Sequence, residues 1–216
     1  MQKTKEKDFI EIDYIGRIKE TSQIFDLTYE DIARKENIYN KNAKYGPRII
    51  CLGENQILQS LDKFLVGKEV GKTYILELKP EEAFGKKDFK LIKIVPASFL
   101  KEQKINPFPG LQINASGLLG TILSVSGGRT TIDFNHPLAS KNLVYEIKIN
   151  KIVEKDEEKL RSLLESILGL ADNESKIKSD NNKATITLKP KIPTDAKEEL
   201  KTKAKELIPN LEISFS

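Results

Sequence analysis

Two segments of alternating apolar and polar residues lie far apart in the chain, and they limit the folds that it can adopt. In residues 9–20, FIEIDYIGRIKE, one face of an extended chain would carry Ile10, Ile12, Tyr14 and Ile18. In residues 143–154, LVYEIKINKIVE, one face would carry Leu143, Tyr145, Ile147 and Ile149. Alternation with a period of two predicts half-buried β-strands. Since the later strand needs neighbours, we expect it to complete a sheet that the N-terminal residues begin.

An acidic residue interrupts the second predicted strand. The polar stretch 19–23 predicts a turn, and 24–28, IFDLT, predicts a strand that returns beside the first one. Asp26 stands there between apolar neighbours, and a buried carboxylate costs several kcal/mol unless a partner answers its charge. Asp26 therefore faces either water or a site. In the second case, Tyr14 and Asp26 would face the same cavity.

The next residues predict two more strands and a helix. Residues 29–47 begin with helical spacing and continue as a polar loop, and 48–53 predict a short strand. Residues 72–80 predict another strand. Residues 54–67 have an apolar stripe at spacings of three and four and end in glycine, which predicts an amphipathic helix. The stripe consists of Ile57, Leu58, Leu61 and Leu65.

The middle segment 86–135 differs in amino-acid composition from the segments on either side of it. It contains Pro96, Pro107 and Pro109, and the glycine pair 127–128 predicts the turn of a hairpin. Its seven basic and three acidic residues account for the whole net charge of +4 of the chain. We therefore expect a small separate β unit whose weak positive potential attracts acidic partners. This charge is too sparse for the basic footprint of a nucleic-acid binder.

The tail 155–216 predicts a third unit. Residues 156–169 form an amphipathic helical pattern with acids at its start and glycine at its end. A hairpin, a second helix with Asp195 and Glu198 at capping-box spacing, and a last strand follow. About 60 residues are only marginally stable alone, so we expect this unit to dock on the chain or to form a homodimer. Its twelve acidic and twelve basic residues argue against nucleic-acid binding.

Composition excludes several kinds of site. Cys51 is the only cysteine and His136 the only histidine of the 216 residues, so we expect no disulfide within the chain and no metal centre. A phosphate-binding glycine motif is absent from the sequence, and we expect no cofactor. An unpaired thiol, with neither a leader pattern nor an apolar run of about 20 residues, predicts a cytoplasmic protein without a membrane segment.

Three blocks of the sequence resemble one family in their order and spacing. They are IGRIKETSQIFDLT, LGENQILQSLDKFLVGKEVGKTYILELKPEEAFG and FNHPLASKNLVYEIKINKI. Over roughly residues 8–154 the chain is similar to FKBP-type peptidyl-prolyl cis-trans isomerases of the SlyD-like, long archaeal type. In that type a second domain is inserted in the flap after the A-[YF]-G block, which is where the proline-rich segment begins here.

The resemblance implies an α+β fold of three domains. Residues 1–85 and 136–154 would form the FKBP-like domain, a bent antiparallel sheet around a short helix. Residues 86–135 would form the insert-in-flap chaperone domain, a small β domain, and 155–216 a C-terminal α+β domain that could dimerise. The client partners would be unfolded or partly folded polypeptides with Xaa-Pro bonds, and an FK-type macrolide would be an inhibitor.

The resemblance also implies the site residues. The catalytic residues would be Tyr14, Asp26 and Phe84. The substrate-binding pocket would add Phe25, Ile57, Leu58, Leu61 and Tyr145. The chaperone surface would comprise Leu91, Ile92, Ile94, Val95, Phe99, Leu100 and Phe108. Such a pocket lowers the barrier to rotation by binding the twisted imide more tightly than the planar one, and it needs no nucleophile.

Three positions depart from the usual pattern of the family. Phe84 stands where many members have Tyr, Leu61 where single-domain members have Trp, and Tyr145 where Phe is usual. The loss of the hydroxyl at position 84 would lower turnover more than binding. An alternative function is therefore a non-catalytic module that binds proline-containing segments, or a factor that assembles complexes or docks on a ribosome.

Overall fold

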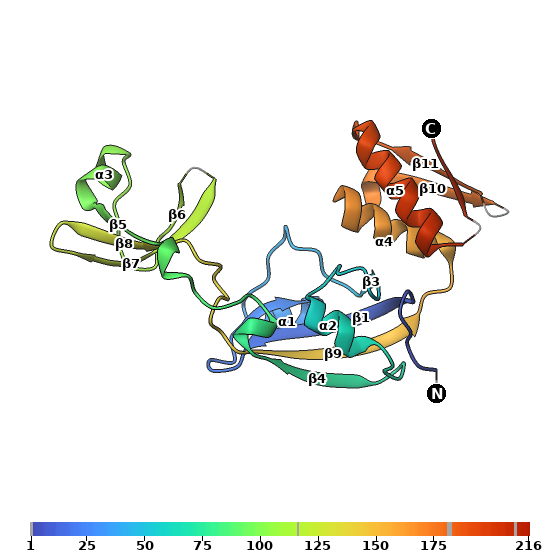
Figure 1. Ribbon diagram of the computed structural model, residues 1–216, viewed down its shortest axis with the longest axis horizontal. Coiled ribbons are helices and arrows are strands. Elements are labelled where there is room, and N and C mark those ends of the chain that lie inside the picture. The colour runs from blue at the N-terminus through green and yellow to red at the C-terminus, as the bar shows by residue number, and fades with distance from the viewer. Residues whose placement is uncertain (1, 116, 181–182, 210) are drawn as a thin grey trace. The chain divides into compact units, whose positions relative to one another are not determined.

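The computed structural model describes residues 2–115, 117–180, 183–209 and 211–216. The chain forms two compact units, of which the first comprises residues 1–77 and 144–216 and the second residues 78–143 (Figure 1). None of the helices in these described ranges is long and apolar enough to cross a membrane.

The first unit is built on a five-stranded sheet in which β1 has three partners. Its strands are β1 (Phe9–Ile18), β2 (Ile24–Leu27), β3 (Arg48–Cys51), β4 (Thr73–Leu78) and β9 (Leu143–Ile152). The strand order is β2-β1-β9-β4, and β3 also pairs with β1. This order confirms the expectation that the segment 143–154 completes the N-terminal sheet. The apolar faces predicted for both segments are buried.

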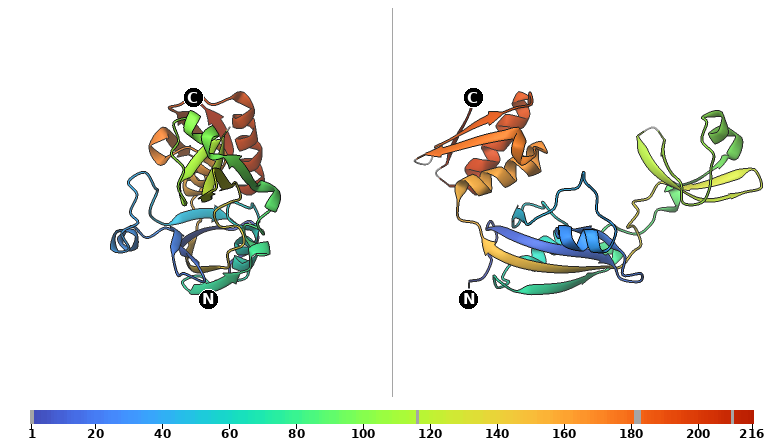
Figure 2. Two further views of the ribbon diagram at one scale, coloured as in Figure 1. Left: turned by 90° about the vertical axis from the view of Figure 1, so that its left-hand side faces the viewer. Right: turned by 180° about the vertical axis from the view of Figure 1, so that it is seen from behind.

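Two helices accompany this sheet, α1 (Glu30–Lys35) and α2 (Gln59–Leu65), and α2 lies beside the sheet (Figures 1 and 2). The helix predicted over 54–67 was too long at both ends. Gly53 and Asn55 have positive φ angles of 90° and 52°, which a helix cannot contain. At the two caps, Leu58 has a non-helical ψ of 130° and Val66 has an extended backbone. Ile57 and Leu58 therefore lie in the turn before α2 and not on it.

The C-terminal part of the first unit is a three-stranded mixed sheet with two helices. Its elements are α4 (Asp156–Leu168), η3 (Asp172–Glu174), β10 (Ser175–Asp180), β11 (Lys183–Leu188), α5 (Thr194–Leu207) and β12 (Glu212–Phe215). β11 lies between an antiparallel β10 and a parallel β12. Gly169 ends α4 in the left-handed conformation, as predicted. The tip of the predicted hairpin, 181–182, lies outside the described residues.

The predicted capping box of α5 was wrong. The helix begins at Thr194 with Pro193 at the N-cap, which places Asp195 inside the first turn. An acid in this turn stabilises the helix by its charge at the positive end of the dipole, whereas a cap needs a side chain one residue before the helix. Glu198 pairs instead with Lys201 at 2.7 Å.

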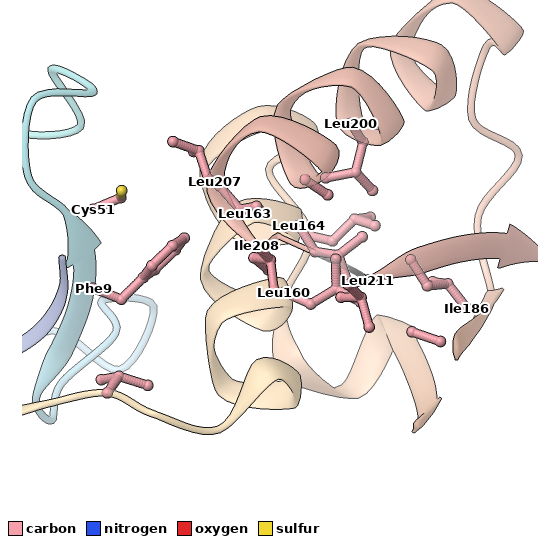
Figure 3. Close-up of a cluster of buried hydrophobic side chains, with 14 residues drawn as sticks. Phe9, Cys51, Leu160, Leu163, Leu164, Ile186, Leu200, Leu207, Ile208 and Leu211 are labelled. Carbon is pink, nitrogen blue, oxygen red and sulfur yellow. The ribbon is translucent and has the colours of Figure 1, made fainter. Parts of the chain in front are cut away.

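A single apolar cluster, here called the docking cluster, joins the C-terminal part to the sheet (Figure 3). From the sheet it contains Phe9, Cys51 and Val153, and from the C-terminal elements it contains residues such as Leu160, Leu163, Leu164, Ile186, Leu200, Leu207 and Ile208. Two ion pairs flank it, Lys7 with Glu206 at 3.0 Å and Lys203 with Glu54 at 2.6 Å. The apolar stripes of α4 and α5 are thus covered within one chain, so a homodimer would have to use other surfaces.

The second unit is an antiparallel sheet with a short helix. Its elements are η1 (Pro80–Glu82), η2 (Phe89–Leu91), β5 (Ile92–Pro96), α3 (Ala97–Glu102), β6 (Gln112–Ala115), β7 (Leu118–Ser126) and β8 (Arg129–Asp133). The strand order is β5-β8-β7-β6, and Gly127 and Gly128 form the β7–β8 turn with positive φ angles. The helix α3 was not predicted. Together the three sheets confirm the α+β fold class.

One predicted surface residue belongs to the core of the second unit. Leu100 on α3 is 3% exposed and packs with Ile113, Ile122 and Ile132. Because α3 needs an apolar side chain to hold it on the sheet, Leu100 cannot serve as a client-binding surface. Val95 also packs against this core.

We expect Phe9→Ala to lower the free energy of unfolding by about 3–5 kcal/mol, because it leaves a void in the docking cluster. The matched change Phe89→Ala removes the same ring from a position that is 84% exposed, and it should alter stability by less than about 0.5 kcal/mol. Urea denaturation of both variants measures the difference. Equal losses would show that Phe9 does not carry the docking.

Candidate active site

A hydrogen bond between Tyr14 and Asp26 lies at the centre of the candidate site. In the antiparallel pairing of β1 with β2, Gly16 faces Asp26, and Tyr14 is two residues from Gly16 on the same face. The Tyr14 hydroxyl donates to Asp26 Oδ2 at 2.8 Å. Tyr14 is buried and Asp26 is half-buried. The acid in the apolar strand is therefore the acceptor of a buried phenol.

Three aromatic rings from three strands surround this hydrogen bond. The Tyr145 ring from β9 lies 6.2 Å from the Tyr14 ring, and it meets the Phe25 ring edge to face at 5.6 Å. Gly16 makes room for this packing, because a Cβ atom there would come within 2.7 Å of Phe25 Cζ. Gly16 was not predicted as a site residue, although it is the one position in 9–18 with no side chain. We call Tyr14, Phe25 and Tyr145 the aromatic cluster.

A second hydrogen-bond group fixes the strand backbone behind Tyr14. The Thr28 hydroxyl accepts from the Tyr14 backbone N–H at 3.0 Å and donates to Asp13 Oδ1 at 2.7 Å. The side-chain amide of Asn150 donates to Asp13 Oδ2 at 2.8 Å. These contacts link β2, β1 and β9, so they hold the strands that carry the aromatic cluster in one arrangement.

The predicted pocket residues of the α2 region depend on a buried carboxylate. Asp62 is 3% exposed, and it accepts the backbone N–H groups of Gly53 at 2.9 Å and Asn55 at 3.0 Å. These bonds compensate the burial of its charge and order the turn that carries Ile57 and Leu58. Both residues are half-buried, whereas Leu61 on α2 is buried.

Phe84 belongs to the second unit. It is half-buried, and its ring stacks on that of His136 with a centroid distance of 4.2 Å and an angle of 3°. The His136 Nδ1 accepts the backbone N–H of Leu138 at 3.2 Å, so this histidine has a structural role there. The part of Phe84 in the site of the first unit stays a prediction.

The two phenols of the aromatic cluster favour their neutral forms. Burial first, and then the charge of Asp26, raise the pKa of Tyr14 and of Tyr145. Burial likewise raises the pKa of the Cys51 thiol to about 12. In the part of the chain that the structure describes, no group of three His, Cys, Asp or Glu residues could hold a metal ion. The site thus presents an apolar aromatic surface with one carboxylate, which suits binding more than nucleophilic attack.

The second unit exposes apolar side chains beyond those that were predicted. Of the predicted residues, Leu91, Ile94, Phe99 and Phe108 are exposed, whereas Ile92 is half-buried. Five further apolar residues that were not predicted are also exposed: Phe89, Leu118, Leu119, Leu123 and Val125. Consecutive leucines at 118–119 were an available signal, because two neighbours on a strand cannot both face the core.

Comparisons with known proteins give one family match and several curated relatives. The family described as the IF domain of FKBP26 matches residues 93–138. A short-type peptidyl-prolyl cis-trans isomerase of Methanocaldococcus jannaschii is 29% identical over 68% of this chain and 93% of its own length. The FKBP-type isomerase SlyD of Helicobacter pylori is 27% identical over 57% of this chain and 69% of its own.

A solved structure shows a weaker likeness. A multi-domain immunophilin from Arabidopsis thaliana aligns with 76% of this chain and 45% of its own, at 13% identity and a TM-score of 0.36. That score is too low to support an argument about fold. The matched insert family and the curated relatives identify the class that this chain resembles, the FKBP-type peptidyl-prolyl cis-trans isomerases with an insert-in-flap domain.

We expect the buried phenols of Tyr14 and Tyr145 to ionise at higher pH than exposed tyrosines. A pKa that is higher in the folded than in the unfolded chain stabilises the fold fully below the unfolded value, about 10, and this contribution is lost as the pH rises towards the folded value. The free energy of unfolding should therefore fall above about pH 10, and less so in Tyr14→Phe/Tyr145→Phe. Tyrosinate absorbance and urea denaturation measure both effects. Ionisation of all six tyrosines in one step would contradict this expectation.

Proposed function

We propose that this protein accelerates cis-trans isomerisation of Xaa-Pro bonds in polypeptides, with the aromatic cluster and Asp26 as the site where the proline binds. The observation that carries the proposal is the hydrogen bond of 2.8 Å from Tyr14 to Asp26 beside the rings of Phe25 and Tyr145. It places one fixed polar group at the edge of an apolar surface, which is the arrangement that small binding sites use for orientation.

The reaction needs no covalent intermediate. Rotation about an Xaa-Pro bond has a barrier of about 18–20 kcal/mol, because it breaks the resonance of the imide. The twisted imide has less charge separation than the planar one, so a surface that excludes water favours it over the better hydrated ground state. Asp26, oriented by Tyr14, supplies a fixed charge near the rotating group.

The remaining predicted residues have supporting roles in this proposal. Ile57, Leu58 and Leu61 would form walls of the proline pocket, and Phe84 would be a third catalytic residue. The FKBP-like domain would comprise residues 1–85 and 136–154. Residues 86–135 would be the chaperone domain and 155–216 the C-terminal domain. The buried, unpaired Cys51 suits a reducing compartment, and we propose a cytoplasmic location.

The exposed apolar residues of the second unit would hold unfolded or partly folded polypeptide. Phe89, Ile94, Phe99 and Phe108 are each at least half exposed, and exposed apolar patches often mark binding surfaces. Holding a client on the same chain as the proline site raises the local concentration of its Xaa-Pro bonds. This surface would therefore matter for whole proteins more than for short peptides.

We expect the protein to accelerate the cis-to-trans relaxation of a proline-containing tetrapeptide, and Tyr14→Phe and Asp26→Asn to lower kcat/KM about tenfold each. A hydrogen bond to a charged group contributes about 1.5 kcal/mol, which corresponds to this factor. A protease-coupled or fluorescence assay measures the rate. The control Tyr39→Phe removes a hydroxyl from outside the aromatic cluster and should keep the activity.

Two outcomes would separate the rival function from this one. Saturable binding of a proline peptide or an FK-type macrolide without any acceleration would identify a non-catalytic binding module. An unchanged relaxation rate without binding would reject the site altogether.

We expect Phe89→Ser/Ile94→Ser/Phe99→Ser to slow assisted refolding of a proline-limited protein by roughly tenfold or more, through loss of client binding. Tetrapeptide isomerisation should change far less. The control Ile38→Ser/Val66→Ser/Ile75→Ser removes three exposed apolar side chains from the first unit and should spare refolding. Equal losses by both triple variants in the refolding assay would contradict a client surface on the second unit.

A further inference from the structure

A cleft of about 430 Å³ lies within the first unit where β3 packs against α4. Lys44, Arg48 and Ile57 line one wall, and Ser162, Glu165 and Ser166 on α4 line the other. The side-chain amide of Gln56 bridges the walls by donating to Ser166 Oγ at 2.9 Å. The C-terminal domain thus contributes one side of a hollow whose other side belongs to the FKBP-like sheet.

Two residues that line the cleft relate it to the candidate active site. Ile57 lines the cleft and is also one of the residues proposed for the proline pocket. Arg48 faces Ile12 in the β1–β3 pairing, and Tyr14 is two residues from Ile12, so all three side chains lie on one face of the sheet. The positive charge of Arg48 also opposes the rise that burial and Asp26 cause in the pKa of Tyr14.

Two polar groups of the cleft have no partner among the described residues. Lys44 pairs with Glu165 at 2.6 Å and with Asp172 at 3.6 Å. The charge of Glu165, the acidic residue in the lining, is therefore compensated. Arg48 forms no ion pair with any residue that the structure describes. The Ser162 hydroxyl has no hydrogen-bond partner there either, although Ser162 is only 7% exposed. Arg48, which is half-buried, and Ser162, which is buried, therefore both line the cleft without such a partner.

We propose that this cleft is a subsite for the residues next to the proline, and that Arg48 selects substrates with a Glu or Asp side chain there. The guanidinium binds the carboxylate, and the Ser162 hydroxyl donates to a carbonyl of the extended chain. The inference rests on the proposed function, because it assumes that the proline lies in the aromatic cluster. It gives the C-terminal domain a direct part in substrate choice.

Peptides that carry either Glu or its isostere Gln at one position test this inference. The variable position is two or one residues before the proline, or one or two residues after it. Wild-type kcat/KM should favour Glu over Gln roughly threefold to tenfold at one or more positions, as expected for a partly shielded ion pair, and less at high salt. Arg48→Gln should bring this ratio near one, and Arg48→Glu should invert it.

Two further variants separate local binding from general effects. Arg161→Gln makes the same charge change on α4, where Arg161 pairs with Glu157, and it should keep the Glu preference. Ser162→Ala should raise KM for Glu and Gln peptides alike, roughly twofold to fivefold, without loss of stability. An unchanged KM would remove Ser162 from the subsite.

The proposed function and this inference fail in different ways. Acceleration of all peptides with equal rates for Glu and Gln at all four positions would overturn the Arg48 subsite alone. Absence of any acceleration would overturn the proposed catalysis. In that case the Kd values of labelled Glu and Gln peptides, measured by fluorescence anisotropy, still decide whether Arg48 selects a carboxylate.

Discussion

The arrangement of the first unit depends on the pairing of β1. This strand has partners along both of its edges, and β2 and β3 share one edge. Phe9–Ile12 pair with β3, Ile15–Arg17 pair with β2, and β9 covers the other edge. These backbone bonds decide where each side chain of β1 points. Phe9 enters the docking cluster, whereas Tyr14 meets Asp26. Because a slip of one residue would turn both to the opposite face, one strand positions both the candidate site and the C-terminal elements.

Most carboxylates near the site accept hydrogen bonds that compensate their charge. Asp26 accepts from Tyr14, Asp13 from Thr28 and Asn150, and Asp62 from two backbone N–H groups. Bonds of this kind offset desolvation and hold the acceptor still. Arg48 has no ion pair, and the Ser162 hydroxyl no hydrogen-bond partner, in the part of the chain that the structure describes. Groups that a fold leaves without partners are the ones available to a ligand.

The sequence predicted the strands well because their alternation records burial directly, as at Ile10, Ile12 and Tyr145. It predicted the ends of helices less well, as at the start of α2. The turn at Gly53 and Asn55 depends on Asp62, a residue of α2 whose carboxylate accepts their backbone N–H groups. Leu100 was misplaced since an apolar residue on a short helix gives no sign of the side it faces. The Tyr14–Asp26 contact was foreseen from the resemblance. Gly16 and Arg48 were missed because their roles arise only from cross-strand neighbours.

The late position of β9 in the chain has a consequence for synthesis on the ribosome. β1 is made first, yet its partner at residues 143–152 follows about seventy residues that belong to another folding unit. Until that partner emerges, one edge of β1 is open, and contacts this distant in sequence form slowly. An independently folding second unit would shorten the effective gap between the two strands by compacting the chain that separates them. Translation order would then favour closing the small unit before the large one.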